Sequence, residues 1–209
     1  MAKPYFKFGA MGSSKTAQAL MTKFNYEEKD QTVWLMKPAT DTRDDRRDDD
    51  GKIMTVLRSR IGLYAPAEAI GSNVDLYAEF VRRGGNGKYT DVIICDECQF
   101  LTPRQVDELK DLADKLDVPV LCFGLRSDFQ TKLFPGSKRL FEIADSITEI
   151  KSICRCGRKA TVNARFDDDG DIVIEGEQVV LGGNDRYEGM CYKCYRALVE
   201  DKLAGGRRV

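Results

Sequence analysis

Histidine is absent from the sequence. It is the side chain that most often exchanges protons near neutral pH, and it is also the commonest protein ligand of zinc. The absence excludes a histidine base and a histidine-bound metal. Any proton transfer must therefore use a carboxylate, and any zinc site must be built mainly from cysteine.

Long apolar runs and an excess of one charge are also missing. No run approaches the roughly 20 apolar residues of a membrane span, and residues 1–5 lead into a strand-like stretch without the apolar segment of a signal peptide. The 33 basic and 34 acidic side chains nearly cancel, whereas nucleic-acid-binding proteins usually carry clustered basic residues. We expect a cytoplasmic protein that has a small-molecule partner and binds neither nucleic acid nor a membrane.

What remains is the composition of an ordinary globular protein. The 209 residues are 42% hydrophobic and 32% charged, which suits one main core with a small appended domain. Helix-like stretches separate four short apolar stretches that are typical of buried strands, at residues 5–8, 32–36, 92–95 and 118–123. This alternation predicts an α/β fold with a mostly parallel sheet, helices on both faces and ligands at the carboxyl ends of the strands.

The clearest helix signal begins at Thr102. Thr102 is a favourable N-cap, Pro103 suits the first helical turn, and Gln105 completes a capping box. Apolar residues then recur at helical spacing, so the sequence predicts a helix with one buried face.

The pattern changes after about Ile150. Two close cysteine pairs flank two alternating strand-like segments and a glycine-rich loop. We therefore expect a main domain over residues 1–150 and a small domain over residues 151–209.

Two acidic segments are predicted to lie outside the core. Residues 167–171, between Phe166 and Ile172, have the Asp and Gly content of a hairpin turn, with a calcium site as the alternative. Residues 41–52 are too polar for a core and predict a mobile loop.

Residues 9–16 have the pattern and position of a phosphate-binding loop. They follow the first predicted strand and open a helix-like stretch over residues 16–24. In such a loop, backbone N–H groups hold phosphate oxygens, Lys15 reaches the β- and γ-phosphates, and the Thr16 hydroxyl can bind magnesium. Ser14 stands where glycine is usual, and a turn without a ligand is the alternative. The predicted nucleotide-binding residues here are Gly9, Ala10, Met11, Gly12, Ser13, Ser14, Lys15 and Thr16.

Two carboxylates follow the predicted strand at residues 91–95. Asp96 is placed like an acid that holds Mg²⁺, directly or through water, and Glu97 can accept the proton of an attacking hydroxyl. Because histidine is absent, Glu97 is the predicted base; a solvated strand end is the alternative. We include Asp96, Glu97, Cys98 and Gln99 in the predicted nucleotide site.

Cys95 and Cys98 also match the C-x-x-C spacing of redox and metal pairs. A redox pair normally opens a helix, whereas Cys95 closes an apolar run typical of a central strand. Cys95, Cys98 and Cys122 are therefore predicted to be small core residues.

Four other cysteines form two close pairs, Cys154 with Cys156 and Cys191 with Cys194. Four thiolates around one zinc ion form the usual closed structural site, whereas a catalytic zinc keeps an open position. The spacing predicts structural Zn²⁺, which would help to stabilise a domain too small for a large core. Unliganded buried cysteines are the alternative.

Taken together, these segments resemble the thymidine kinase family of the tetrameric, zinc-containing type. The resemblance runs over nearly the whole chain and also includes residues 59–62, 96–101, 124–129, 154–160 and 182–187. It implies a RecA-like P-loop kinase domain over residues 1–150, and a zinc-binding domain over residues 151–209 with a lasso-like loop that covers the substrate.

The resemblance further implies ATP-dependent phosphorylation of the thymidine 5′-hydroxyl, with Glu97 as the base. Lys15, Mg²⁺ bound by Thr16 and Asp96, and Arg60 would stabilise the transferred phosphoryl group. A homotetramer inhibited by thymidine triphosphate (dTTP) is implied as well. The implied base pocket comprises Met11, Phe100, Leu125, Phe129 and Phe134, and the implied covering loop contributes Val179, Val180, Leu181, Gly182 and Tyr187.

Two other functions compete with this one. A nucleic-acid-stimulated P-loop ATPase is suggested by residues 96–99, which superficially resemble a helicase acidic box, but the chain lacks a second motor domain and a basic excess. A non-catalytic nucleotide sensor would bind ATP without turnover. Replacement of Glu97 discriminates between a kinase and a sensor.

Overall fold

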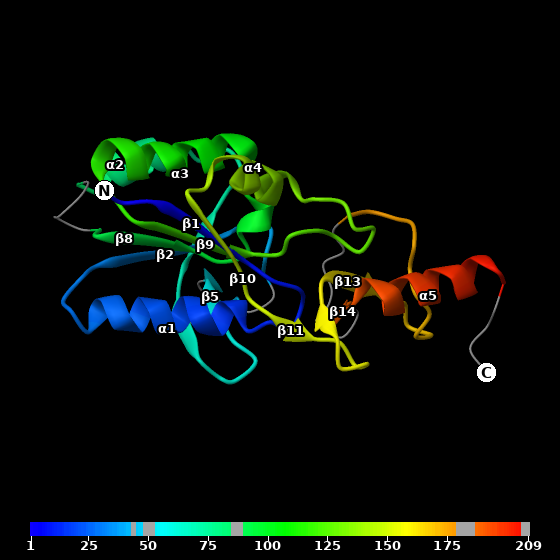
Figure 1. Ribbon diagram of the computed structural model, residues 1–209. Helices are drawn as coiled ribbons and strands as arrows, with labels where there is room; N and C mark the ends of the chain where they lie inside the picture. The colour runs from blue at the N-terminus through cyan, green and yellow to red at the C-terminus, as the bar shows by residue number, and fades with distance from the viewer. Residues whose placement is uncertain (43–44, 48–52, 85–89, 179–186, 206–209) are drawn as a thin grey trace.

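A six-stranded parallel sheet forms the centre of the computed structural model, which describes residues 1–42, 45–47, 53–84, 90–178 and 187–205 (Figure 1). The strand order is β10-β1-β9-β8-β2-β7, and every neighbouring pair is parallel. This confirms the predicted α/β fold. The strands are β1 (Pro4–Phe8), β2 (Val33–Pro38), β7 (Glu68–Ile70), β8 (Val92–Cys95), β9 (Val120–Gly124) and β10 (Ser146–Glu149).

Helices cover both faces of this sheet, as predicted. In Figure 1, α1 (Lys15–Glu27) lies below the sheet, and α2 (Leu76–Arg82), α3 (Pro103–Leu116) and α4 (Pro135–Ile143) lie above it. Successive side chains of a strand point to opposite faces. Accordingly Ile93 and Cys95 of β8 pack in the core beneath α3, while Val92 and Ile94 pack in the core beside α1. All residues of β8 are fully buried, so burial on both faces explains the continuous apolar strand.

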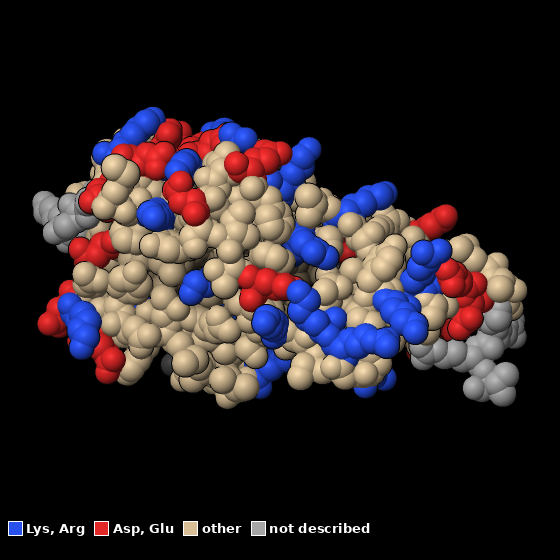
Figure 2. Space-filling view, viewed as in Figure 1, with Lys and Arg blue, Asp and Glu red and all other residues tan. Residues whose placement is uncertain are grey.

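The helix predicted after Thr102 is present as α3. The Thr102 hydroxyl accepts from the Gln105 amide at 3.2 Å, and the Gln105 side chain accepts from the Thr102 amide at 3.1 Å. Its buried apolar residues are Val106, Leu109, Leu112 and Ala113. Charged residues of both signs cover the outer surface of α3 and α4, as Figure 2 shows, and several pair, including Arg139 with Asp107.

The chain beyond the sheet forms a smaller unit that we call the cysteine region: β11 to β14 with α5. Antiparallel pairs join β11 (Ser152–Ile153) to β12 (Lys159–Ala160) and β13 (Val162–Arg165) to β14 (Tyr187–Met190), and α5 (Tyr192–Leu203) follows. Its core contains Val162, Ala164, Ile172 and Met190 together with Ala10 from the start of the chain. We call the six-stranded sheet with α1 to α4 the sheet region.

The predicted acidic hairpin turn is confirmed. Phe166 and Ile172 form an antiparallel bridge. The Asp167 amide donates to the Asp171 carbonyl at 3.0 Å, and Gly170 takes a φ of 81° that favours glycine.

The prediction that residues 41–52 are too polar for the core is wrong for Asp41, which is 4% exposed. Lys37 is fully buried at the end of β2, and its ammonium lies 3.6 Å from Asp41 and 3.1 Å from Asp45. Ion pairing with a buried lysine is the physical reason, because an ionised carboxylate can be buried when its charge is matched. Residues 43–44 and 48–52 lie outside the described residues.

Short strands complete the part of the sheet region next to Lys37. β3 (Arg46–Arg47) pairs with β4 (Ile53–Met54), and β5 (Val56–Arg58) pairs with β6 (Tyr64–Pro66). A single 3-10 turn, η1 (Cys98–Phe100), follows β8. Among the described helices, none combines the length and apolar composition that a bilayer span requires.

Candidate active site and cysteine cluster

A polar pocket opens at the carboxyl ends of the central strands. It contains roughly 710 Å³ of space, with the open solvent at its mouth included. Four segments form its walls: the loop after β1 with the start of α1, the segment after β2 with Asp41, the β5–β6 hairpin, and the loop after β8. The lining residues are Met11, Gly12, Ser13, Ser14, Lys15, Thr16, Ala17, Asp41, Leu57, Arg58, Ser59, Arg60, Ile61, Asp96 and Glu97.

The loop between β1 and α1 is compact and conformationally constrained. A Cβ atom on Gly9 would lie 2.6 Å from the Ile150 carbonyl oxygen, so no larger residue fits there. Gly12 has a φ of 76° and Ser14 a φ of 61°. The left-handed conformation costs a non-glycine residue about 1–2 kcal/mol, so Ser14 introduces strain at the position where the pattern usually has glycine. Such strain is typical of ligand-binding loops.

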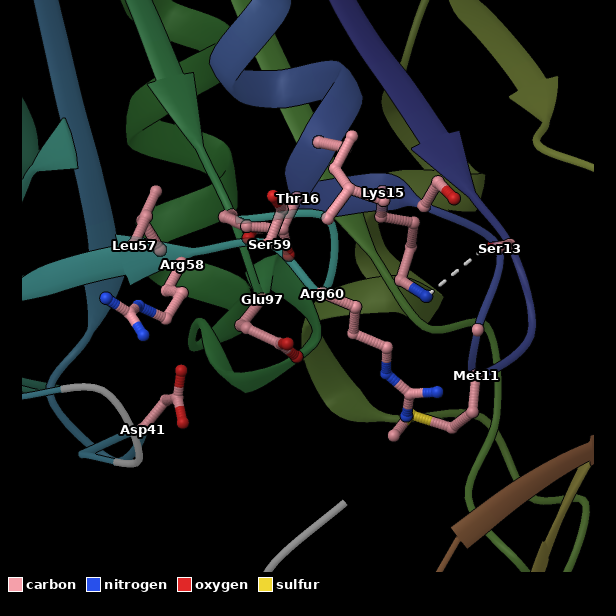
Figure 3. Close-up of a pocket in the computed structure, with 15 residues that line it drawn as sticks. Met11, Ser13, Lys15, Thr16, Asp41, Leu57, Arg58, Ser59, Arg60 and Glu97 are labelled. Atoms are coloured by element: carbon pink, nitrogen blue, oxygen red, sulfur yellow. Dashed lines mark hydrogen bonds between the residues drawn. The ribbon is translucent and has the colours of Figure 1, made fainter. Parts of the chain in front are cut away.

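Lys15 extends across this loop. Its ammonium donates to the Gly9 and Ala10 carbonyls at 3.2 and 3.0 Å and to the Ser13 hydroxyl at 3.3 Å, and the last contact is drawn in Figure 3. The backbone amides of Gly12 and Ser14 donate no hydrogen bond to any residue that the structure describes. Two free amides beside a lysine at a helix N-terminus fit the oxygens of a phosphate group.

Asp96 presents a buried carboxylate to the pocket at 1% exposure. Burial, and after it the charge of Glu97, raise the pKa of this carboxyl to about 7, although the Thr16 hydroxyl and Lys15 act to lower it. Neither oxygen has a hydrogen-bond partner of standard geometry among the described residues. A buried carboxylate beside a threonine hydroxyl fits the donor set of Mg²⁺, so Thr16 and Asp96 could hold this ion.

Glu97 points into the same pocket from a strained backbone. It has a φ of 51° and caps η1, and its carboxylate accepts a hydrogen bond from the Gln99 side chain. In Figure 3 the carboxylate faces the open space between Asp41 and Arg60. The Arg60 guanidinium reaches the phosphate loop: one of its nitrogens lies 3.8 Å from the point where a Cβ atom on Gly12 would lie. Lys15, Arg60 and Glu97 therefore line one pocket.

Several predicted site residues do not line this pocket. Phe129 is fully buried, Phe134 is 4% exposed, and the Phe100 ring packs edge-on against Phe134 at 5.6 Å. Leu125 donates its amide to the Gln99 side chain at 2.9 Å and lies behind Glu97. Tyr187 is half-buried in β14. The predicted loop residues Val179, Val180, Leu181 and Gly182 lie outside the described residues.

Cys95, Cys98 and Cys122 are all fully buried, and they belong to the core on the α3 face. The prediction that they are core residues is confirmed. Because Cys98 is enclosed, its thiol cannot reach a ligand in the pocket. Gln99 is 1% exposed and contacts the pocket only through its hydrogen bond to Glu97.

Sequence reasoning predicted Arg60 but did not predict several other residues that line the pocket. Leu57, Arg58, Ser59 and Ile61 come from the β5–β6 hairpin, and Asp41 follows β2. Lys37 at the end of the apolar strand β2 could have predicted that Asp41 is buried, since a buried lysine requires a carboxylate partner.

The four cysteines of the second region converge. The Sγ atoms of Cys154, Cys156, Cys191 and Cys194 all lie within 4.8 Å of one another. Tetrahedral zinc with Zn–S bonds of about 2.3 Å places its sulfurs nearly 4 Å apart, so the cluster fits a four-thiolate metal site. Gly157 shapes the first pair's turn, with a φ of 83° and an amide that donates to the Cys154 carbonyl at 2.8 Å.

Local hydrogen bonds shift the thiol pKa values of this cluster in opposite directions. The backbone amide of Cys194 donates to the Cys191 sulfur, which lowers the pKa of Cys191 to about 6. Hydrogen bonding to the Cys191 and Cys156 sulfurs raises the pKa of Cys194 to about 12. Because thiolate is the metal-binding form, a bound cation would favour the ionised form of the Cys194 sulfur.

The fold and the pocket define a class of protein. A loop with Lys15 and Thr16 follows the first strand, an acidic pair follows β8, and both open onto one pocket at the carboxyl edge of a parallel sheet. This combination defines a P-loop nucleotide-binding protein.

Comparison with known proteins identifies the family within this class. A family model described as thymidine kinase matches residues 2–195. The thymidine kinase of Shewanella oneidensis is 39% identical over 96% of this chain and 100% of its own length, and that of Shigella dysenteriae serotype 1 is 42% identical over 96% and 93%. The chain belongs to the thymidine kinase family, as its sequence motifs suggested.

A comparison with solved structures adds little. The replication initiator DnaA bound to AMPPCP and single-stranded DNA aligns with 72% of this chain and 40% of its own, at 18% identity and a TM-score of 0.40. A similarity of this size supports no conclusion about function.

Proposed function

We propose that this enzyme transfers the γ-phosphate of ATP to the 5′-hydroxyl of thymidine and so forms thymidine monophosphate. The observation that carries the proposal is that Lys15 of the phosphate loop and Glu97 after β8 line the same pocket. Supporting it, curated relatives about 40% identical over nearly the full length are thymidine kinases.

In the proposed reaction, the phosphate loop binds the triphosphate through the Gly12 and Ser14 amides and through Lys15. Magnesium held by Thr16 and Asp96 would neutralise part of the phosphate charge. Glu97 accepts the proton of the 5′-hydroxyl as that oxygen attacks the γ-phosphorus, the bond from that phosphorus to the β,γ-bridging oxygen breaks, and ADP leaves. Arg60 stabilises the charge of the transferred group. Catalysis then depends on position and electrostatics, and Gln99 orients the base through its hydrogen bond to Glu97.

The proposed thymine pocket contains Met11, Phe100, Leu125, Phe129 and Phe134, with residues 179–187 as its cover. Its support is that Met11 lines the polar pocket and that Gln99 joins Glu97 to the Leu125 amide. The segment with Leu125 and Phe129 thus starts directly behind the proposed base.

We further propose that the four cysteines hold a structural Zn²⁺, for which their convergence is the support. Two domains, residues 1–150 and 151–209, remain the proposed division of the chain. A cytoplasmic location is proposed from the sequence composition, and a homotetramer inhibited by dTTP is proposed from the family resemblance alone.

ADP release by purified protein tests the proposed function. With Mg·ATP present, thymidine should stimulate ADP release strongly, other nucleosides should stimulate it less, and single-stranded DNA should have no effect. Stimulation by DNA alone would instead establish a nucleic-acid-dependent ATPase. Tight ATP binding without stimulation by any nucleoside would establish a nucleotide sensor.

A further inference from the structure

One side chain of the cysteine region holds the phosphate loop. Asn163 lies in β13 and is 3% exposed. Its carboxamide oxygen accepts from the Met11 amide at 2.8 Å, and its nitrogen donates to the Ser127 carbonyl at 2.8 Å. Since an amide N–H only donates and a carbonyl only accepts, the two partners fix the orientation of the carboxamide. Asn163 thus joins the phosphate loop to the loop between β9 and α4.

The surrounding packing leaves the phosphate loop little freedom. Asn163 pairs with Gly189 across the β13–β14 hairpin, and a Cβ atom on Gly189 would lie 2.5 Å from the Met11 carbonyl oxygen. Ala10 packs into the same core as Val162 and Met190. The hairpin therefore supports the loop directly, and its position determines where Met11 can lie.

The contact also directs the loop amides. The Met11 amide donates to Asn163, while Gly12 and Ser14 take left-handed conformations, and their amides donate to no residue that the structure describes. These conformations are strained at Ser14. Without the acceptor on Asn163, the Met11 amide would have to find water, and the loop would have to be ordered when phosphate binds. Ordering a binding loop at that moment weakens affinity.

We propose that Asn163 is a positioning residue through which the cysteine region holds the phosphate loop in its phosphate-binding conformation. The proposal rests on the proposed function only in naming Mg·ATP as the ligand. It assigns to the cysteine region a role in binding the phosphate donor, in addition to any role in covering thymidine.

The affinity of N163A for Mg·ATP, measured by calorimetry without thymidine, tests this proposal. Loss of one buried hydrogen-bond acceptor should weaken binding roughly tenfold, which corresponds to about 1.4 kcal/mol. The matched control is Y195F, since the Tyr195 hydroxyl donates to the Phe129 carbonyl at 2.7 Å and joins the same two regions without contacting the phosphate loop. The affinity of Y195F should stay within about twofold of the parent protein's. Unchanged binding in N163A, or equal losses in both variants, would overturn the proposal.

A second variant, N163D, allows a pH-dependent measurement that a general loss of stability cannot mimic. It also replaces N163A as the test if N163A fails to fold. In N163D, the protonated acid can still accept from the Met11 amide and donate to the Ser127 carbonyl, whereas the ionised form cannot donate and repels that carbonyl. The ratio of Mg·ATP affinities, parent over variant, should therefore rise as pH increases through the pKa of the introduced acid. A ratio that does not change with pH would contradict the role of Asn163.

The proposed function and this inference can fail separately. A parent protein that binds Mg·ATP but does not phosphorylate thymidine would end the kinase proposal and leave the Asn163 experiment valid. A parent protein that phosphorylates thymidine, together with an N163A variant of unchanged Mg·ATP affinity, would overturn the inference alone.

Discussion

The sheet region and the cysteine region reach their folds by different means. Two apolar layers enclose the sheet, and the residues of β8 are fully buried between them. Within the described residues, the sheets of the cysteine region are two-stranded, and its smaller core includes Cys154, Cys191 and Ala10 from the phosphate loop. In Figure 1 it lies beyond the carboxyl ends of the strands. The first region has a large apolar core of its own, whereas the second shares a small core with the phosphate loop, so we expect its stability to depend more on the thiol cluster.

This difference explains where the chemistry is located. The sheet region holds groups that are unfavourable in themselves: strained Ser14 and Glu97, and the buried charges of Lys37 and Asp96. A large apolar core can compensate for such groups. The cysteine region contributes mainly hydrogen bonds to the loops of its neighbour, as from Asn163. We therefore expect changes in the sheet-region site to affect rate, and changes in the cysteine region to affect stability and phosphate affinity.

The largest effect is expected from E97Q. Loss of the base should lower thymidine turnover by about 10²–10⁴-fold, while Mg·ATP affinity stays close to that of the parent protein. Steady-state kinetics and calorimetry measure the two quantities. E149Q is the control, because Glu149 also ends a parallel strand but pairs with Lys159 at the surface; it should keep nearly full activity. An unaffected rate in E97Q would remove Glu97 as the base.

C191S should have the largest effect on stability. Loss of one thiolate should abolish tight binding of about one zinc per chain, and we expect a loss of about 3 kcal/mol, since structural zinc stabilises small domains by more than this. Elemental analysis and urea unfolding provide the measurements. The control C122A removes a core cysteine outside the cluster and should keep the metal. A metal-free parent protein with the same stability as C191S would contradict the difference drawn between the regions.

K37M tests whether buried charge in the sheet region depends on pairing. It leaves Asp41 and Asp45 without their buried cation, and such a loss costs about 3 kcal/mol. The control K23M removes the i,i+4 partner of the exposed Glu27 and should cost at most about 0.5 kcal/mol. Urea unfolding of both variants gives the comparison, and K37M/D41N should recover part of the loss. Equal stability of the two single variants would show that the ion pairs contribute nothing.

The smallest effect concerns the surface of α2 and depends on pH. Hydrogen bonding from Arg82 lowers the pKa of Glu79 to about 2, against the effect of burial and with further help from Arg83. A lowered pKa in the folded state means that the ionised form stabilises the fold. The contribution is complete above the ordinary pKa of 4.5 and is lost as pH falls from there toward 2.

Because Arg82 is mostly exposed, this contribution should be below about 1 kcal/mol. The stability difference between the parent protein and E79Q, measured by urea unfolding, should therefore shrink between about pH 5 and pH 2.5. A difference that grows over this range would contradict the assigned sign.

Local chemistry made much of this molecule predictable from sequence. Helix α3 follows from Thr102, Pro103 and Gln105 because capping involves only residues within one turn. The phosphate loop follows from its place between a strand and a helix, and the acidic pair from its place at the end of an apolar strand. The cysteine spacing alone predicted a cluster that the fold does bring together.

Contacts between distant segments were not predictable in this way. Asp41 was expected in a polar loop, but its ion pair with Lys37 stabilises it in a buried position. The wall formed by Leu57 and Ile61 depends on how the β5–β6 hairpin packs. Asn163 gave only a weak signal, as a polar residue between apolar neighbours in a strand. Its partners, Met11 and Ser127, are far from it in sequence, and only the fold reveals them.

The central claim is that the phosphate loop and Glu97 act on one phosphoryl-transfer path. A crystal structure with Mg²⁺ and a bisubstrate analogue, in which phosphates link the thymidine 5′-oxygen to adenosine, tests it most directly. We predict a Glu97 carboxylate oxygen about 2.6–3.2 Å from the thymidine 5′-oxygen, with the amides of Gly12 and Ser14 and the Lys15 ammonium on the phosphates. A Glu97 carboxylate turned away from the 5′-oxygen, with no water between them, would contradict the claim.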